Sequence, residues 1–171
     1  AYTVIGGGSY CTGGAGTNVG LSGSDAGIDY QLFYLGSPIG SPLAGTGLPL
    51  DFGLQTGAGL YTVVATNTVT TCTKTMAGST TISINPLPNA YSVTGGGVYC
   101  AGGTGVNISL SNSDAGVNYQ LFNGASPVGS AMAGTGTVLD FGFHTATGTY
   151  TIVATNASTG CNNTMSGSAT V

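Results

Sequence analysis

The feature that most constrains how this chain can fold is an internal repeat. Residues 1–82 align with residues 90–171 without a gap. AYTVIGGGSYC matches AYSVTGGGVYC, LSGSDAGIDYQLF matches LSNSDAGVNYQLF, and LDFGLQTGAGLYTVVATN matches LDFGFHTATGTYTIVATN. Because both halves carry the same series of motifs, they should adopt the same structure. We therefore predict two small domains, residues 1–84 and 90–171, rather than one large domain.

A short proline-containing segment separates the two repeats. Residues 85–89 read NPLPN and contain Pro86 and Pro88. Proline has no backbone N–H and a fixed φ angle, so this segment cannot join the centre of a sheet. We expect it to be an extended, stiff linker.

Local signals within each repeat favour β-strands. Ile28, Tyr30 and Leu32 occupy alternate positions, which is the period of a half-buried strand. The segments 50–54 and 139–143 alternate in the same way. In the second repeat the sequence FNGA contains an Asn-Gly pair, which is typical of a tight hairpin turn.

A tyrosine follows a glycine-containing corner in both repeats, at Tyr61 and Tyr150. This placement resembles the tyrosine corner of immunoglobulin-like (Ig-like) sandwiches. Each repeat holds about seven short strands separated by turn residues. The prediction is an all-β chain of two tandem Ig-like antiparallel β-sandwiches.

The composition excludes several classes of partner. Only 4% of residues are charged, and Lys+Arg is 1, so the chain cannot neutralise nucleic-acid phosphates or bind an anionic membrane surface. No apolar run approaches the length of a membrane span, so we expect no membrane insertion. The chain opens at Ala1 without a signal peptide, which we interpret as a mature fragment or an excerpt of a longer chain.

Four cysteines are equally spaced in the two repeats, at Cys11 and Cys72 and at Cys100 and Cys161. They form no Cys-x-x-Cys pair, so disulfides are favoured over a metal site. Two pairings are open. Each repeat closes its own disulfide, Cys11–Cys72 and Cys100–Cys161, or Cys11 bonds Cys161 across the repeats. In the second case Cys72 and Cys100 bond units before and after.

No motif predicts catalysis, a cofactor or a metal ion. The glycine triplets lack the lysine of a phosphate loop, and we expect them to form the turn into the second strand. His144, the one histidine, aligns with Gln55 in the first repeat. Aspartates occur at matching places in the SDAG and LDFG motifs: Asp25, Asp114, Asp51 and Asp140. We interpret SDAG as a turn, with a weak calcium site as the alternative.

Taken together, YCTGG/YCAGG, GLYTVVATN/GTYTIVATN, the cysteine that follows, and INPLPN resemble the tandem Ig-like or PKD-like repeats of Bacteroidota surface proteins. Such repeats occur in adhesins and gliding-motility proteins, often exported by the type IX secretion system. The resemblance implies an extracellular, cell-surface module and carries no catalytic residues.

These observations lead to one expected function and one alternative from another class. We expect a structural module that is not an enzyme, either a tandem-repeat stalk or the subunit of a filament, whose partners are copies of itself end to end. The alternative is an adhesin domain that binds glycans through loops at one end of the sandwich, with Tyr34 and the SDAG turn as contacts. A threonine cluster in residues 68–75 leaves ice binding as a third hypothesis.

Overall fold

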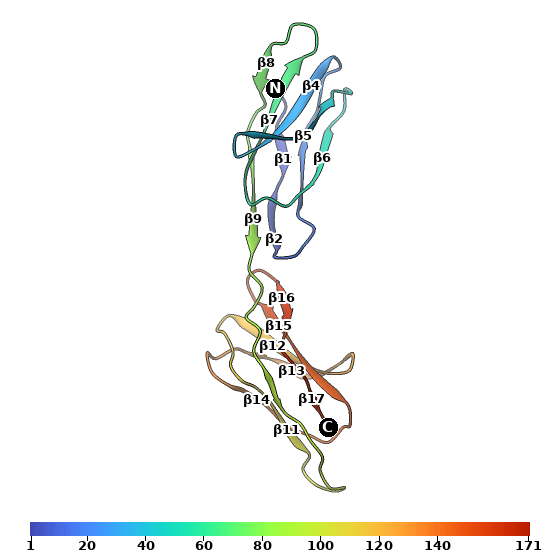
Figure 1. The fold of residues 1–171 in the computed structure, drawn as a ribbon, viewed down its shortest axis with the longest axis vertical. Coiled ribbons are helices and arrows are strands. Elements are labelled where there is room, and N and C mark those ends of the chain that lie inside the picture. Colours follow the sequence, from blue (N-terminus) through green and yellow to red (C-terminus); the bar gives the residue numbers. More distant parts are fainter. The chain divides into compact units, whose positions relative to one another are not determined.

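A computed structural model describes residues 1–171 and contains strands but no helix (Figure 1). The chain divides into two compact units, Ala1–Asn85 and Pro86–Val171. The strands of the first unit are β1 (Val4–Gly6), β2 (Gly8–Cys11), β3 (Thr17–Leu21), β4 (Ile28–Tyr34), β5 (Ser37–Ala44), β6 (Leu50–Gln55), β7 (Gly59–Asn67), β8 (Thr73–Thr75) and β9 (Thr80–Asn85). Those of the second are β10 (Val93–Gly95), β11 (Val106–Leu110), β12 (Val117–Asn123), β13 (Ser126–Ala133), β14 (Leu139–His144), β15 (Thr149–Asn156), β16 (Asn162–Thr164) and β17 (Ala169–Thr170).

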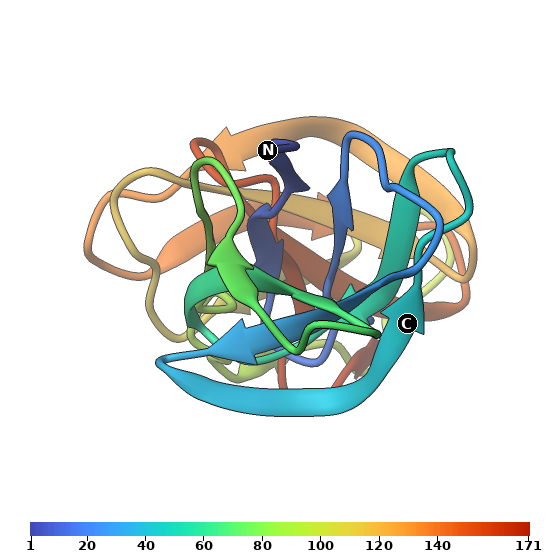
Figure 2. The same cartoon turned by 90° about the horizontal axis from the view of Figure 1, so that it is seen from above.

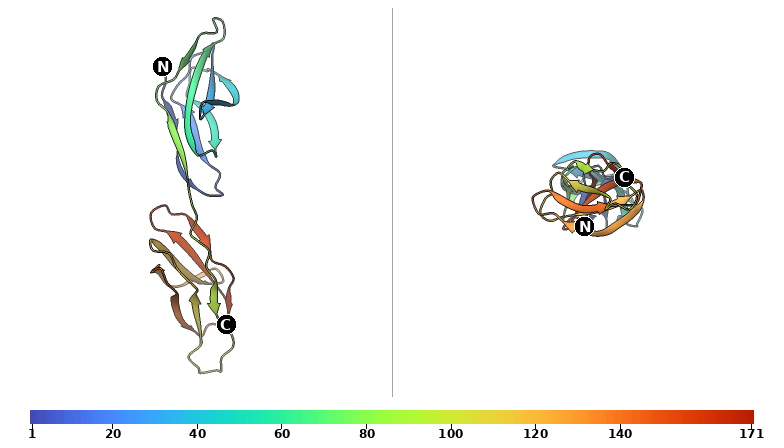
Figure 3. Two further views of the ribbon diagram at one scale, coloured as in Figure 1. Left: turned by 60° about the vertical axis from the view of Figure 1, so that its left-hand side comes forward. Right: turned by 90° about the horizontal axis from the view of Figure 1, so that it is seen from below.

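The first unit is a sandwich of two sheets. One sheet has the order β1-β3-β6, and the other has the order β2-β9-β7-β4-β5, with β8 also paired to β7. The two layers are visible in the end-on view of Figure 2, which places β4, β5 and β7 opposite β1, β3 and β6. All pairings are antiparallel except that of β2 with β9, which is parallel. Figure 3 shows β9 and β2 running along the same edge of this unit.

Alternating side chains of the strands fill the space between the sheets. In the first unit Val19, Leu21, Tyr30, Leu32 and Val63 are buried, as the period-2 pattern predicts. Each buried aliphatic side chain contributes roughly 1.5–3 kcal/mol through the hydrophobic effect. The second unit has an equivalent core of its own. The predicted fold, all-β with two sandwiches in tandem, is confirmed.

Each unit has more strands than the seven or so expected, because single strands are interrupted. The glycine triplet is the clearest case. It does not form a turn between two strands of one sheet, since Gly6 ends β1 and Gly8 begins β2, and these strands belong to different sheets. Gly6, Gly7 and Gly8 have φ angles of 91°, 76° and 111°, which other residues rarely adopt. A Cβ at Gly6 would overlap the carbonyl oxygen of Asn18. The triplet therefore lets one strand change sheets.

The second unit repeats this topology with one difference. Its sheets have the orders β10-β11-β14 and β13-β12-β15-β16, with β17 also paired to β15. Residues 97–100, the counterpart of β2, pair with no strand, since the given sequence ends at Val171, the counterpart of Ile82, and so does not include the counterparts of Ser83–Asn85. In the first unit the partner of β2 is β9, which extends to Asn85 and so includes the first residue of the predicted linker.

Candidate functional site

The tyrosines of the two corners make the same hydrogen bond. The Tyr61 hydroxyl donates to the carbonyl oxygen of Gly57 at 2.8 Å, and that of Tyr150 donates to Ala146 at 2.8 Å. Both tyrosines are buried, and desolvation raises the pKa of Tyr61, so its hydroxyl stays protonated and able to donate at neutral pH. This bond to a backbone oxygen a few residues upstream is the geometry of a tyrosine corner.

The four cysteines are in two states. Cys72 and Cys100 carry free, exposed thiols, whereas Cys11 and Cys161 are disulfide-bonded. The structure therefore contains neither of the within-repeat pairs considered from the sequence. The reason is distance: β2 pairs with the part of β9 that extends past the first residue of β7, and Cys72 follows the last residue of β7. The nine residues of β7 extend about 30 Å, against roughly 6 Å between bridged Cα atoms.

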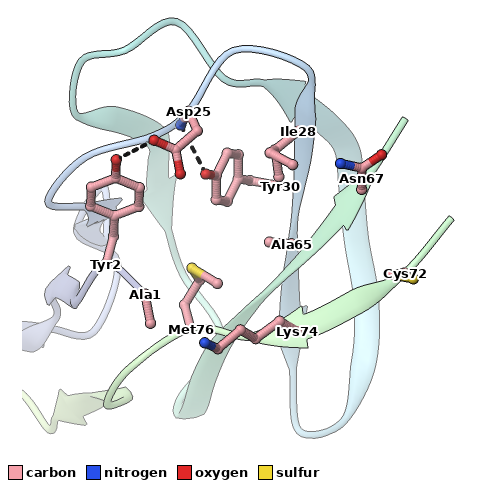
Figure 4. Close-up of a pocket in the computed structure, with 10 residues that line it drawn as sticks. All are labelled: Ala1, Tyr2, Asp25, Ile28, Tyr30, Ala65, Asn67, Cys72, Lys74 and Met76. Atoms are coloured by element: carbon pink, nitrogen blue, oxygen red, sulfur yellow. Dashed lines mark hydrogen bonds between the residues drawn. The ribbon is translucent and has the colours of Figure 1, made fainter. Parts of the chain in front are cut away.

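The SDAG motif of the first repeat forms a hydrogen-bonded turn beside a pocket (Figure 4). The Tyr2 hydroxyl donates to Asp25 Oδ1 at 2.6 Å, and the Asp25 backbone N–H donates to the Tyr30 hydroxyl at 3.0 Å. The bond to the Asp25 carboxylate raises the pKa of Tyr2. Buried Ser24 donates to the carbonyl oxygen of Leu48 at 2.6 Å, which holds the turn from its other side.

We call this cavity the first-repeat pocket; its volume is about 270 Å³. Its lining combines an apolar floor with a few polar groups at the rim. Met76 and Tyr30 are buried, while Asp25, Cys72 and Lys74 are exposed (Figure 4). Lys74 is the only Lys or Arg of the chain, and it lies here. The pocket thus offers the Asp25 carboxylate and the Lys74 ammonium around an apolar floor.

The same place in the second repeat is filled by the chain itself. Pro88 is buried there, and Asn163 donates from Nδ2 to the Pro88 carbonyl oxygen at 2.8 Å. Asn89 donates from Nδ2 to Asp114 Oδ2 at 3.0 Å, while the Tyr91 hydroxyl donates to Asp114 Oδ1 at 2.6 Å. Residues 88–89 are therefore an integral part of the second unit. The alignment of the two repeats did not predict this contact. Residue types alone do not indicate which side chain will bind the backbone of a buried proline.

The LDFG aspartates stabilise turns. Asp51 Oδ1 accepts from the backbone N–H of Gly53 and from Asn18 Nδ2, both at 2.7 Å. These two bonds lower the pKa of Asp51, the backbone bond having the larger effect. Asp140 has equivalent bonds in the second repeat, and its pKa is lowered for the same reason. The structure groups no three His, Cys, Asp or Glu side chains in a geometry suited to a metal ion.

His144 and Gln55 have interchangeable structural roles. His144 Nε2 lies 3.1 Å from the carbonyl oxygen of Phe141, and Gln55 donates from Nε2 to the carbonyl oxygen of Phe52 at 2.9 Å. The His144 ring also packs on Tyr150, with centroids 5.1 Å apart. This explains why the repeat tolerates either residue.

Tyr34, expected as a contact of the adhesin alternative, makes a ring contact and a hydrogen bond within its own unit. It is half-buried at the end of β4, its ring packs on Tyr61 with centroids 5.0 Å apart, and its hydroxyl donates to Ala58 at 2.8 Å. Its counterpart Asn123 donates to the carbonyl oxygen of Thr147 at 3.3 Å. Tyr34, one of the contacts expected for glycan binding, is therefore held in place by Tyr61 and Ala58.

The comparisons with known proteins give no family. No family model matches the chain, and no curated protein matches it. Among solved structures, the human OSCAR ligand-binding domain is 11% identical, with 99% of this chain and 97% of that chain covered and a TM-score of 0.40. The fibronectin(III)-like modules of Clostridium thermocellum CbhA are 9% identical, with coverages of 100% and 94% and a TM-score of 0.42. At TM-scores below 0.5, neither likeness bears on function.

The strand order and the tyrosine corners define the class of protein: a pair of Ig-like β-sandwiches. No helix in the structure is both long enough and apolar enough to cross a bilayer.

Proposed function

We propose that this chain is a non-catalytic structural module, two repeats of an extracellular stalk or of a cell-surface filament. One observation carries the proposal. Pro88 and Asn89, which were expected to be a linker, are built into the second unit by hydrogen bonds to Asn163 and Asp114. A connector that belongs to the fold of the next repeat suits an array under load better than it suits independent binding domains.

The oxidation states of the cysteines support an array in which disulfides cross-link successive repeats. Cys11 and Cys100 are equivalent in the repeat, as are Cys72 and Cys161, and one member of each pair is disulfide-bonded. We propose that the cysteine of each YC motif bonds the later cysteine of the following repeat, so that Cys11 bonds Cys161. Cys100 and Cys72 would then bond neighbouring repeats in the same manner.

Formation of each such bond converts two thiols into one disulfide. Two protons and two electrons pass to a small-molecule disulfide oxidant, which is released as two thiols. Disulfides of this kind persist in oxidising compartments, which supports a location outside the cell. The resemblance to Bacteroidota repeats suggests export by the type IX system as the route.

Electron microscopy of the native source, with an antibody against this chain, tests the function. We expect label along filaments or stalks that project from the cell surface. Isolated monomers at high concentration, together with label confined to the cell interior, would contradict the proposal. Peptide mapping without reduction tests these cross-links: a peptide joining Cys11 to Cys161 is expected, and one joining Cys11 to Cys72 would exclude them.

A further inference from the structure

We infer that a cleft between the edge strands β5 and β6 of the first unit binds a neutral saccharide of one or two sugar rings. This inference goes beyond the proposed structural function and does not rest on it, because a repeat of a stalk can carry a ligand on its side. The site also differs from the adhesin alternative, which placed the contacts in loops at one end of the sandwich.

The cleft lies at the side of the first unit, between one edge of each sheet. β5 is an edge strand of one sheet, and β6 is an edge strand of the other. Residues of both strands, together with Leu32 of β4, line a cavity of about 320 Å³. This volume lies at the lower end of the range of roughly 300–1,000 Å³ that is usual for small-molecule sites. The cleft therefore suits a small ligand.

Apolar side chains supply the buried part of the lining. Leu32 is buried, and Ile39, Leu43 and Phe52 are half-buried. Phe52 adds one aromatic ring, on which the C–H groups of a sugar ring can pack through dispersion and the hydrophobic effect. A ligand of this cleft must therefore have an apolar face.

The polar side chains of the lining keep unused hydrogen-bond acceptors. Asp51 accepts both of its side-chain hydrogen bonds at Oδ1, and no protein donor reaches its Oδ2. Gln55 donates from Nε2 to the carbonyl oxygen of Phe52, so its Oε1 is unused. The exposed hydroxyl of Ser41 makes no hydrogen bond within the protein. These groups can accept from hydroxyl donors, and the bond to the carboxylate is of the stronger, charge-assisted kind.

The charge and the acceptors of the lining restrict the class of ligand. No lysine, arginine or histidine lines the cleft, and the Asp51 carboxylate repels an anion such as a phosphate or a uronic acid. A purely apolar ligand would displace water from the unused acceptors without replacing its hydrogen bonds, which weakens binding. A neutral saccharide supplies both an apolar ring face and several hydroxyl donors.

A β-strand of a partner protein is a poor occupant, because both edges resist strand addition. Pro38 and Pro42 of β5 have no backbone N–H, and a bulge interrupts the register of β5 on β4. In β6 the backbone N–H of Gly53 donates to Asp51 and is not available to another strand. Prolines and bulges protect edge strands from pairing with other chains. A small ligand, which needs no ladder of backbone hydrogen bonds, is therefore favoured.

Titration of the whole chain, followed by NMR of its backbone amides, tests the inference. The neutral probes are glucose, galactose, mannose, N-acetylglucosamine, maltose, cellobiose and lactose, and the charged probes are glucuronate and butylammonium. For at least one neutral sugar we expect saturable shifts centred on Ser41, Phe52 and Gln55, and neither charged probe should bind as tightly. The inference is overturned if no neutral sugar gives saturable shifts, if the shifts are centred outside the cleft, or if a charged probe binds more tightly.

Two variants show which contacts act. Ser41→Ala removes one exposed hydroxyl from an edge strand and should weaken sugar binding about fivefold, the size expected from the loss of one hydrogen bond. Gln55→Leu removes the amide acceptor and should have a similar effect, with unchanged amide signals outside β5 and β6 as the check that the fold is kept. The matched control is Thr81→Ala, which removes an exposed hydroxyl of β9 outside the cleft and should leave the affinity unchanged. Affinities of both variants equal to that of the control would also overturn the inference.

Discussion

Removal of one hydroxyl group tests how the Ig-like corner stabilises each unit. Tyr61→Phe deletes the hydrogen bond to Gly57 and keeps the ring that packs on Tyr34. A net hydrogen bond is worth about 1 kcal/mol, and the unpaired carbonyl adds a further desolvation cost, so we expect a loss of about 1–2 kcal/mol. In a unit of this size each kcal/mol lowers the unfolding midpoint by about 4–8 °C.

Differential scanning calorimetry of the whole chain at pH 7 measures this loss, and Tyr34→Phe is the matched control. Tyr34 also donates to a backbone carbonyl, that of Ala58, but the bond is exposed to solvent, so its removal should cost less than about 0.5 kcal/mol. Tyr150→Phe should reproduce the larger loss in the second unit. The reasoning is refuted if Tyr61→Phe destabilises the chain no more than Tyr34→Phe does.

Three further predictions concern other parts of the chain. The pKa of Asp51 is lowered in the folded state, so its stabilising effect is complete above pH ~4 and is lost as the pH falls through the folded value; Asp51→Asn should flatten this part of an acid titration followed by circular dichroism. Gly45→Ala would place a Cβ against the backbone of the SDAG turn, so we expect urea denaturation to show a loss of several kcal/mol in the free energy of unfolding. The control is Gly27→Ala, which has open space around it and a φ of 81° and should lower that free energy by about 1 kcal/mol. A thiol reagent should label Cys72 and Cys100 in the native chain and no other cysteine; labelling of Cys11 would contradict the assigned oxidation states.

Strands were predictable wherever one face of the strand is buried. Ile28, Tyr30 and Leu32 alternate in the sequence, and they lie in β4 with Tyr30 and Leu32 in the core. The hairpin expected at FNGA joins β12 to β13. Such patterns are local, because the alternation of apolar and polar residues within one strand indicates which of its faces is buried.

Contacts between distant segments were not predictable in this way. The prolines of NPLPN indicate an extended backbone, but the burial of Pro88 depends on Asn163, which lies 75 residues further along the chain. The glycine triplet signals an unusual backbone without specifying that it carries one strand from sheet to sheet. The sequence did not predict the pocket for a related reason: its lining residues come from four separate stretches of the chain, between Ala1 and Met76.

The parallel pairing of β2 with β9 has a mechanical consequence. β2 lies near the start of the first unit and β9 at its end, so a pull on the two ends of this unit drives the paired strands past each other lengthwise. The hydrogen bonds of the ladder then bear the force together rather than one after another.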